Sequence, residues 1–351
     1  MANLTEMSIG FRKFILYLLY AFIGYLVLKV LISFGVQYWK MTHPPVLPPP
    51  NMKFNKLPKP IFSIGATQSA GLIFTLENIE GKPPESTDAG RVYAMPKKLP
   101  TLLSPDRALK FASKIDFTKE PNTVSSTMYY FTDPRDDKRT LSLDIVNMNF
   151  QLKYDYQKTP EIFTEGQINN KEQPVEDVSN YIRSNGLFDE SIAKGKITTE
   201  LLTYEPSEKT FREASSLSAA NTVRVNFFSQ DLDGWKILPP EFSKSYNYAL
   251  YTPGKKIQVI ELFYTFWPIA FDDFGTYPLI SAASAWEELI GGKATVVNFG
   301  GNSRDNIVIR NIYLAYYDSE NPQMYLQPIF VFEGDNNFVA YLPAITSDWL
   351  E

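Results

Sequence analysis

Cysteine is absent from the 351 residues, and histidine occurs once, as His43. Without cysteine the chain has no disulfide, no thiolate nucleophile and no cysteine-ligated metal site. A single histidine in a proline-rich stretch argues against Ser-His-Asp catalysis and against zinc sites built on several histidines. The sequence therefore predicts no catalytic residue, no metal site and no cofactor.

Concentrated positive charge is also missing. The net charge is −5, and the lysines and arginines are scattered along the chain. Because nucleic-acid binding needs a concentrated basic face, nucleic acid is not an expected partner.

Two acidic pairs are candidate sites. Asp231-Leu232-Asp233-Gly234 resembles part of a calcium loop, but Ser229 and Pro240 stand where that loop needs its first acid and its final glutamate. We predict a turn there. Asp272 and Asp273 lie in what reads as a loop, where adjacent acids are usually solvated. We therefore predict that the protein is not an enzyme, with acid-based catalysis as a minor alternative.

A long apolar run is present near the N-terminus, at Phe14–Val36. As a helix it would reach roughly 34 Å, enough to cross a hydrocarbon core about 30 Å thick. Its one charge, Lys29, lies towards the C-terminal end and can extend its ammonium to the headgroups, and Trp39 follows as an interfacial anchor. The run is longer than the apolar core of a signal peptide. It predicts a transmembrane anchor in contact with membrane lipid.

The orientation is argued from charge and size. Arg12 and Lys13 precede the run and favour a cytoplasmic tail at residues 1–13, whereas four lysines beyond it favour the opposite. Since a large following domain translocates despite its charge, we expect the bulk of the chain to be extracytoplasmic on a single-pass cell-membrane anchor.

Residues 37–60 contain clustered prolines, in the run PPVLPPP. Consecutive prolines favour extended polyproline geometry, so we expect a semi-rigid linker. A ligand for a proline-binding module is the alternative.

The remaining chain predicts an α+β fold. Aromatic residues make up 15% of the chain and recur in alternating runs, which is typical of β-rich cores. Helical patterns begin at Ser104, Pro174 and Leu279, and each is followed by strand-like runs. Asn185-Gly186 predicts a left-handed stop for the second helix. We expect three repeated helix-plus-antiparallel-sheet units, at residues 61–172, 173–254 and 255–351. A phase slip near Asn311 predicts a β-bulge.

The last third of the chain carries a resemblance. The segment AASAWEELIGG at Ala282–Gly292, and AYYD, YLQPIFVFEG and FVAYLPAI within Tyr313–Ile345, resemble the YycH/YycI-type extracytoplasmic regulatory proteins of bacteria, whose domains are similar to PepSY-like modules. The resemblance implies a non-enzymatic, membrane-anchored accessory factor that contacts a protein such as a sensor kinase. It carries over no functional residue.

An aromatic group between residues 246 and 267 is the best candidate for a binding surface. Exposed aromatic side chains form interaction hot spots or stack on sugars, whereas aromatic residues in alternating strands usually belong to the core. The residues chosen as a partner surface are Tyr248, Tyr251, Tyr264 and Trp267.

Two functions follow from these features. The first is a non-catalytic, membrane-anchored extracytoplasmic protein that binds a protein partner in the cell envelope, in a regulatory or accessory role. The second is a structural protein that binds the cell wall or a polysaccharide.

We expect Lys29→Leu to leave membrane attachment unchanged, because the apolar run spans the hydrocarbon core without this charge. The measurement is the fraction of protein that stays in the membrane pellet after alkaline carbonate extraction. Release of the variant from the pellet would contradict the assignment of Phe14, Lys29, Val36 and Trp39 to one lipid anchor.

Overall fold

The structure is a computed structural model that describes residues 4–42, 49–62, 67–254 and 258–351. Within the first range, side chains are described for residues 15–36. The chain divides into two compact units, Met1–Pro48 and Pro49–Glu351.

The first unit contains one long helix, α1 (Leu4–Thr42). Its 39 residues give a length of about 58 Å. The segment Ile15–Val36 has a mean hydropathy of 2.3, and none of it is buried against the protein. It is long and apolar enough to cross a membrane, as the sequence predicts. The helix is longer than expected, since it includes residues of the predicted tail and the first six residues of the predicted linker.

The second unit contains two nine-stranded sheets. We call sheet I the one with the hydrogen-bonded order β1-β15-β18-β17-β16-β11, to which β2 is added beside β16, β3 beside β17, and β14 beside β3. Strands β2 and β11 run parallel to β16, and the other pairs are antiparallel. Its strands are β1 (Thr67–Gln68), β2 (Phe74–Leu76), β3 (Ala89–Ala94), β11 (Ile237–Leu238), β14 (Ala270–Pro278), β15 (Thr295–Asn298), β16 (Ile307–Tyr317), β17 (Tyr325–Gly334) and β18 (Val339–Pro343).

Sheet II is antiparallel throughout, with the order β4-β5-β6-β7-β13-β12-β10-β8-β9. Its strands are β4 (Asn122–Thr123), β5 (Met128–Thr132), β6 (Arg139–Asp144), β7 (Phe150–Tyr154), β8 (Ile197–Glu205), β9 (Thr210–Glu213), β10 (Thr222–Phe227), β12 (Tyr248–Tyr251) and β13 (Val259–Tyr264).

The pairing does not follow three successive units. Strand β7 pairs with β13 and β10 pairs with β12, so sheet II joins strands from all three predicted ranges. Sheet I likewise joins β3 to β14 and β17. The fold is α+β with mostly antiparallel sheets, as predicted, but the repeat of helix-plus-sheet units is not confirmed. Alternation within a strand indicates which face is buried, and carries no information about which distant strand lies beside it.

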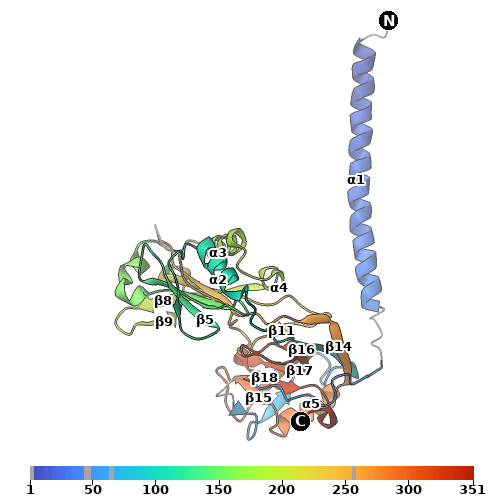
Figure 1. The fold of residues 1–351 in the computed structure, drawn as a ribbon. Helices are drawn as coiled ribbons and strands as arrows, with labels where there is room; N and C mark the ends of the chain where they lie inside the picture. The colour runs from blue at the N-terminus through green and yellow to red at the C-terminus, as the bar shows by residue number, and fades with distance from the viewer. Residues whose placement is uncertain (1–3, 43–48, 63–66, 255–257) are drawn as a thin grey trace. The chain divides into compact units, whose positions relative to one another are not determined.

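Helices cover one face of sheet II. They are α2 (Ser104–Lys114), α3 (Glu172–Asn185) and the short α4 (Glu190–Ala193); Figure 1 shows α2 and α3 side by side over this sheet. Ala112, Val178 and Ile182 from these helices pack with Leu141 and Leu262 of the sheet in one buried cluster. Helix α3 ends at Gly186, whose φ of 57° is the left-handed conformation that the sequence predicts for an Asn-Gly stop.

Short 3-10 helices complete the unit. They are η1 (Tyr156–Lys158), η2 (Pro160–Thr164), η3 (Leu217–Ala219), η4 (Asp335–Asn337) and η5 (Ser347–Trp349).

Sheet I packs against α5 (Ala282–Ile290), which buries Ala282, Ala285 and Leu289. The second half of the predicted linker also belongs to this core. Leu57 is fully buried and pairs with Leu350 near the C-terminus. The predicted 37–60 linker is therefore shorter in the structure, because apolar residues between its prolines bury against sheet I.

Two local predictions have different outcomes. The register of β16 against β17 shifts between Ile309 and Asn311, which confirms the predicted bulge. Asp272 and Asp273 lie within β14 and not in a loop. The register of β14 against β3 is irregular between Ala270 and Phe274, so these two acids occupy a bulged segment, and Asp273 forms an ion pair with Lys53 at 2.7 Å.

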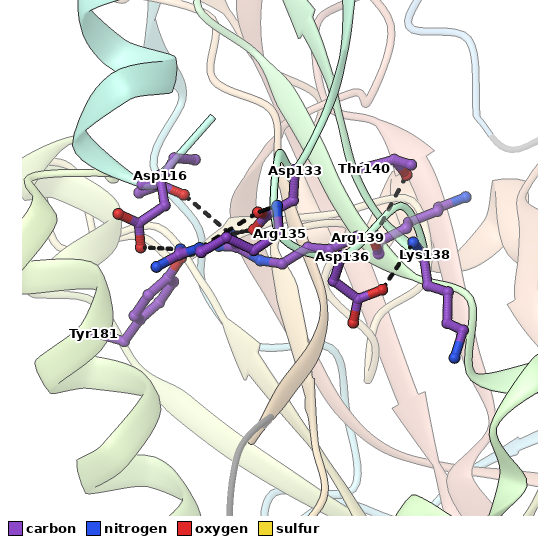
Figure 2. Close-up of polar contacts among 10 residues, drawn as sticks. Asp116, Asp133, Arg135, Asp136, Lys138, Arg139, Thr140 and Tyr181 are labelled. Atoms are coloured by element: carbon purple, nitrogen blue, oxygen red, sulfur yellow. Dashed lines mark hydrogen bonds and ion pairs between the residues drawn. The ribbon is translucent and has the colours of Figure 1, made fainter. Parts of the chain in front are cut away.

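One buried carboxylate holds the hairpin between β5 and β6. Asp133 is 4% exposed, and its carboxylate accepts hydrogen bonds from Arg139 Nη1 at 2.8 Å and the Arg135 backbone N–H at 2.9 Å. Arg139 also donates to the Tyr181 hydroxyl on α3 and to the Ile115 carbonyl after α2. Figure 2 shows these groups converging between the hairpin and the helices. The network ties sheet II to the helices that cover it.

We expect Asp133→Ala to destabilise the second unit by about 3 kcal/mol, because it leaves a mostly buried Arg139 guanidinium without its carboxylate. Arg135→Ala is the matched control. Its side chain is 67% exposed, so solvent screens its ion pairs and its loss should lower stability much less than Asp133→Ala does. The measurement is the midpoint of urea unfolding; equal effects of the two substitutions would contradict the network.

The Asp133 carboxyl also gives the wild type a pH dependence. Burial acts to raise its pKa, but the hydrogen bonds from Arg135 and Arg139 and their charges outweigh burial and lower it. Its contribution to stability is therefore complete above the unfolded-state pKa and is lost as the pH falls through the folded-state pKa.

Candidate functional site

The second face of sheet II carries none of the three α-helices. Along β10, β12 and β13 the side chains alternate between the buried helical side and this open face. On the open face the strands present polar and aromatic side chains, and Gln151 and Lys153 of β7 are exposed. The far end of the face is closed by an aromatic cluster that includes Phe163 from η2 and Tyr204 from β8.

Four side chains form a ladder across the open face, which we call the cation–aromatic ladder. Tyr248 and Phe263 lie opposite each other on β12 and β13, and their rings stack with centroids 4.7 Å apart and planes 11° apart. The Arg224 guanidinium lies 3.5 Å from the Tyr248 ring centroid, and Lys153 Nζ lies 4.8 Å from that of Phe263. A cation thus lies at each end of the ladder, where cation–π attraction stabilises it.

Hydrogen bonds hold the ladder in place. Arg224 donates from Nε to Asn226 Oδ1 and from Nη2 to the Ser245 carbonyl, both at 2.9 Å. The Tyr248 hydroxyl donates to Glu261 Oε2 at 3.2 Å. Burial raises the pKa of Glu261, opposed by the Lys153 charge and by hydrogen bonds from Tyr248 and Tyr156. Burial and the Glu261 charge together raise the pKa of Tyr248, so this hydroxyl stays protonated and is a donor at neutral pH.

A pocket of about 360 Å³ lies beside the ladder, between the open face and the segment that follows β11. We call it the ladder pocket. Its lining contains both signs of charge, with Arg224 and Lys244 as bases and Glu241 and Glu320 as acids. Among the residues that the structure describes, none of these four side chains is in an ion pair. The pocket can therefore engage donors and acceptors of a polar ligand.

The structure divides the four aromatic residues chosen from the sequence. Tyr248 is half-buried on the open face, but Tyr251 and Tyr264 are 4% and 7% exposed in the helical core. Tyr251 donates to Asp177 of α3 at 2.8 Å, and Tyr264 accepts from the Asp189 backbone N–H at 3.1 Å. Their predicted place on a partner surface is wrong, because the three-residue spacing of Tyr248 and Tyr251 puts them on opposite faces of β12.

Trp267 lies apart from the ladder. It is half-buried after the end of β13, and its indole N–H donates to the Glu320 carbonyl at 3.0 Å. Of the predicted anchor residues, Lys29 and Val36 lie on the exposed surface of α1. The side chains of Phe14 and Trp39 lie outside the described residues.

Sequence reasoning missed the charged members of the site. Arg224, Glu261 and Lys153 each stand among alternating strand residues and look like ordinary solvated positions in the sequence. The alternation of side chains along a strand could have indicated one of them, because Glu261 and Phe263 are two residues apart and therefore share one face of β13. The cross-strand register that brings Arg224 to Tyr248 is long-range and is not written in any one segment.

The Asp231–Gly234 segment forms the predicted turn. Asp233 and Gly234 have φ values of 54° and 82°, and Leu232 bridges to Trp235. The Asp233 carboxylate is bound by Arg91 Nη1 at 2.7 Å and by the Tyr93 hydroxyl. Across the described residues, no group of three or more His, Cys, Asp or Glu side chains could hold a metal ion.

Comparison with known proteins gives little further information. No family model matches the chain, and no curated protein matches its sequence. Among solved structures, an uncharacterized protein from Eubacterium rectale ATCC 33656 aligns with a TM-score of 0.41 at 14% identity, over 74% of this chain and 84% of that one.

The raised pKa of Glu261 predicts a pH-dependent effect of Glu261→Gln. A carboxyl whose folded-state pKa is raised contributes most to stability at low pH and less as the pH rises through the folded-state value. We therefore expect Glu261→Gln to be more stable, relative to wild type, at pH 7 than at pH 4. The difference in unfolding free energy, variant minus wild type, should be larger at pH 7. Urea unfolding at both pH values measures it.

Glu213→Gln is the control, because it removes an exposed acid at the end of β9 that neither tyrosine contacts and thus reports the effect of net charge. An identical pH response of the two variants would contradict burial as the cause.

Proposed function

We propose that the protein is a non-catalytic, membrane-anchored extracytoplasmic protein that uses the open face of sheet II to bind a protein partner in the cell envelope. The apolar segment Ile15–Val36 attaches it to the membrane, and the second unit, Pro49–Glu351, carries the binding surface. A regulatory or accessory role, which the resemblance to YycH/YycI-type proteins implies, is part of this proposal.

The observation that carries the proposal is the cation–aromatic ladder beside a pocket lined by both signs of charge. Tyrosine and arginine are, with tryptophan, the side chains that are enriched at the energetic centres of protein interfaces. Arg224 and Lys153 keep N–H donors that no ion pair in the described part of the chain occupies, whereas Glu261 is engaged by two tyrosines. The sheet surface therefore offers hydrogen-bond donors to an acidic segment of the partner. The pocket wall offers the carboxylates of Glu241 and Glu320 to hydrogen-bond donors of the same partner.

A polysaccharide partner is the second candidate, and the ladder makes it the weaker one. Sugar rings bind aromatic side chains by stacking on a free ring face. Tyr248 has Arg224 on its ring and Phe263 stacked against it, and Phe263 lies between Tyr248 and Lys153. A sugar would have to displace a cation, whereas a polypeptide can meet the ring edges and the cations together.

We test the proposal by photocrosslinking in the native cell. A benzophenone amino acid placed at Gln151, exposed on the open face, should crosslink to an envelope protein of discrete mass. The same probe at Glu176, exposed on the helical face, is the control and should give no such product. Lys153→Glu should weaken the Gln151 crosslink at least tenfold by reversing a charge at one end of the ladder. The matched reversal Arg183→Glu, on exposed α3, should leave it unchanged.

Two further measurements separate the outcomes. Deletion of residues 14–36 should release a folded body into the soluble fraction, and a body that loses its circular dichroism spectrum would count against a separate anchor. If that body pellets with isolated wall material and gives no protein crosslink at Gln151, the partner is a polysaccharide and not a protein.

A further inference from the structure

A second, smaller pocket lies away from the ladder. It has a volume of about 200 Å³, and we call it the Asp318 pocket. Apolar walls come from side chains that follow β13 and from β11 and β14, and the polar part of the lining comes from the segment between β10 and β11 and from α4. The lining residues are Ser191, Ser229, Gln230, Asp231, Leu232, Ile237, Phe266, Trp267, Ile269, Phe271 and Asp318.

The charges of this lining have one sign. Asp231 and Asp318 are acidic, and no lysine or arginine lines the pocket. Neither carboxylate is in an ion pair with any residue that the structure describes. Asp318 accepts a hydrogen bond from the Tyr246 hydroxyl, which belongs to the lining of the ladder pocket. The Tyr246–Asp318 pair thus joins the linings of the two pockets.

A carboxylate that is removed from water without a cation is unfavourable unless a partner compensates it. Apolar walls around a carboxylate suit a ligand that has an apolar stem and a cationic end, because burial of the stem and neutralisation of the charge then add together. We propose that the Asp318 pocket binds a primary alkylammonium group, either of a free amine or of a lysine side chain presented by a polypeptide. The proposal is independent of the open face of sheet II.

The pH dependence of this binding has a defined sign. Burial raises the pKa of Asp318 to about 6, and the Tyr246 hydrogen bond opposes that rise. The titratable groups nearest to Asp318 are Tyr246, Tyr317, Asp231 and Glu320, and the cations Arg224 and Lys244 line the neighbouring ladder pocket and not this one. Since the ammonium binds the ionised carboxylate, the affinity should rise about tenfold from pH 5 to pH 7, in proportion to the ionised fraction.

The experiment uses the full chain in nanodiscs of zwitterionic lipid and ligand-observed NMR titration. The probes are n-butylammonium and its neutral analogue 1-butanol. At pH 7 we expect the ammonium to bind at least tenfold more tightly than the alcohol, and Asp318→Asn to remove that difference. Asp305→Asn, at an exposed acid in the turn before β16, should leave the affinity unchanged.

Two polypeptide probes distinguish the source of the ammonium. Nα-acetyl-lysine methylamide that binds more tightly than n-butylammonium indicates a lysine side chain, and weaker binding indicates a free amine. Nα-acetyl-norleucine methylamide is the uncharged control.

A second variant keeps the test decisive if Asp318→Asn fails to fold. Tyr246→Phe keeps the carboxylate and removes its hydrogen bond, so the ammonium should still bind at pH 8 while the midpoint of the pH profile moves upward. Equal affinities for the ammonium and the alcohol, or a pH profile that Tyr246→Phe does not move, would overturn the proposal.

Discussion

Strand β3 is the constraint on which the second unit depends. Its residues Ala89–Ala94 pair with β14 on one side and with the start of β17 on the other. Sheet I therefore joins segments that lie far apart in the chain. The segment between β3 and β14 contains all the strands of sheet II, and within it only β11 returns to pair with β16 of sheet I. Loop-closure entropy grows only slowly with the length of the enclosed chain, so an insertion of this size is tolerable. Residues near both ends of the unit, such as Leu57 and Leu350, then pack in the same core.

The single-sided helical cover of sheet II leaves its other face free of α-helices, and this face is the surface proposed to bind a partner. Helices α2 and α3 bury one face, and the other face stabilises its aromatic residues without a third layer, through cations that lie against them. Tyr248 and Phe263 are consequently held in place by their neighbours while each remains partly exposed. A surface that is ordered before binding loses less conformational entropy when a partner docks, which favours its use as an interface.

Asp133 and Asp318 show how the surroundings of a carboxyl decide its chemistry. Asp133 has Arg139 and Arg135 beside it, and these partners lower its pKa and fix the hairpin to the helices. Asp318 has only a tyrosine hydroxyl, and burial raises its pKa. The first carboxylate is satisfied within the fold and serves stability. The second lacks a cation among the described residues, which makes it available to a cationic ligand.

The sequence alone determined what local patterns can encode. The helix at Ile15–Val36 follows from a long run of apolar residues. The end of α3 at Gly186 follows from its Asn-Gly pair, and the bulge near Asn311 follows from a break in the alternation of apolar residues along β16. Tertiary structure decided which strands are neighbours, and therefore that Tyr248 lies on the open face while Tyr251 lies in the core. The reason is physical: strand periodicity reports two faces, but pairing depends on side-chain packing between segments far apart in the chain.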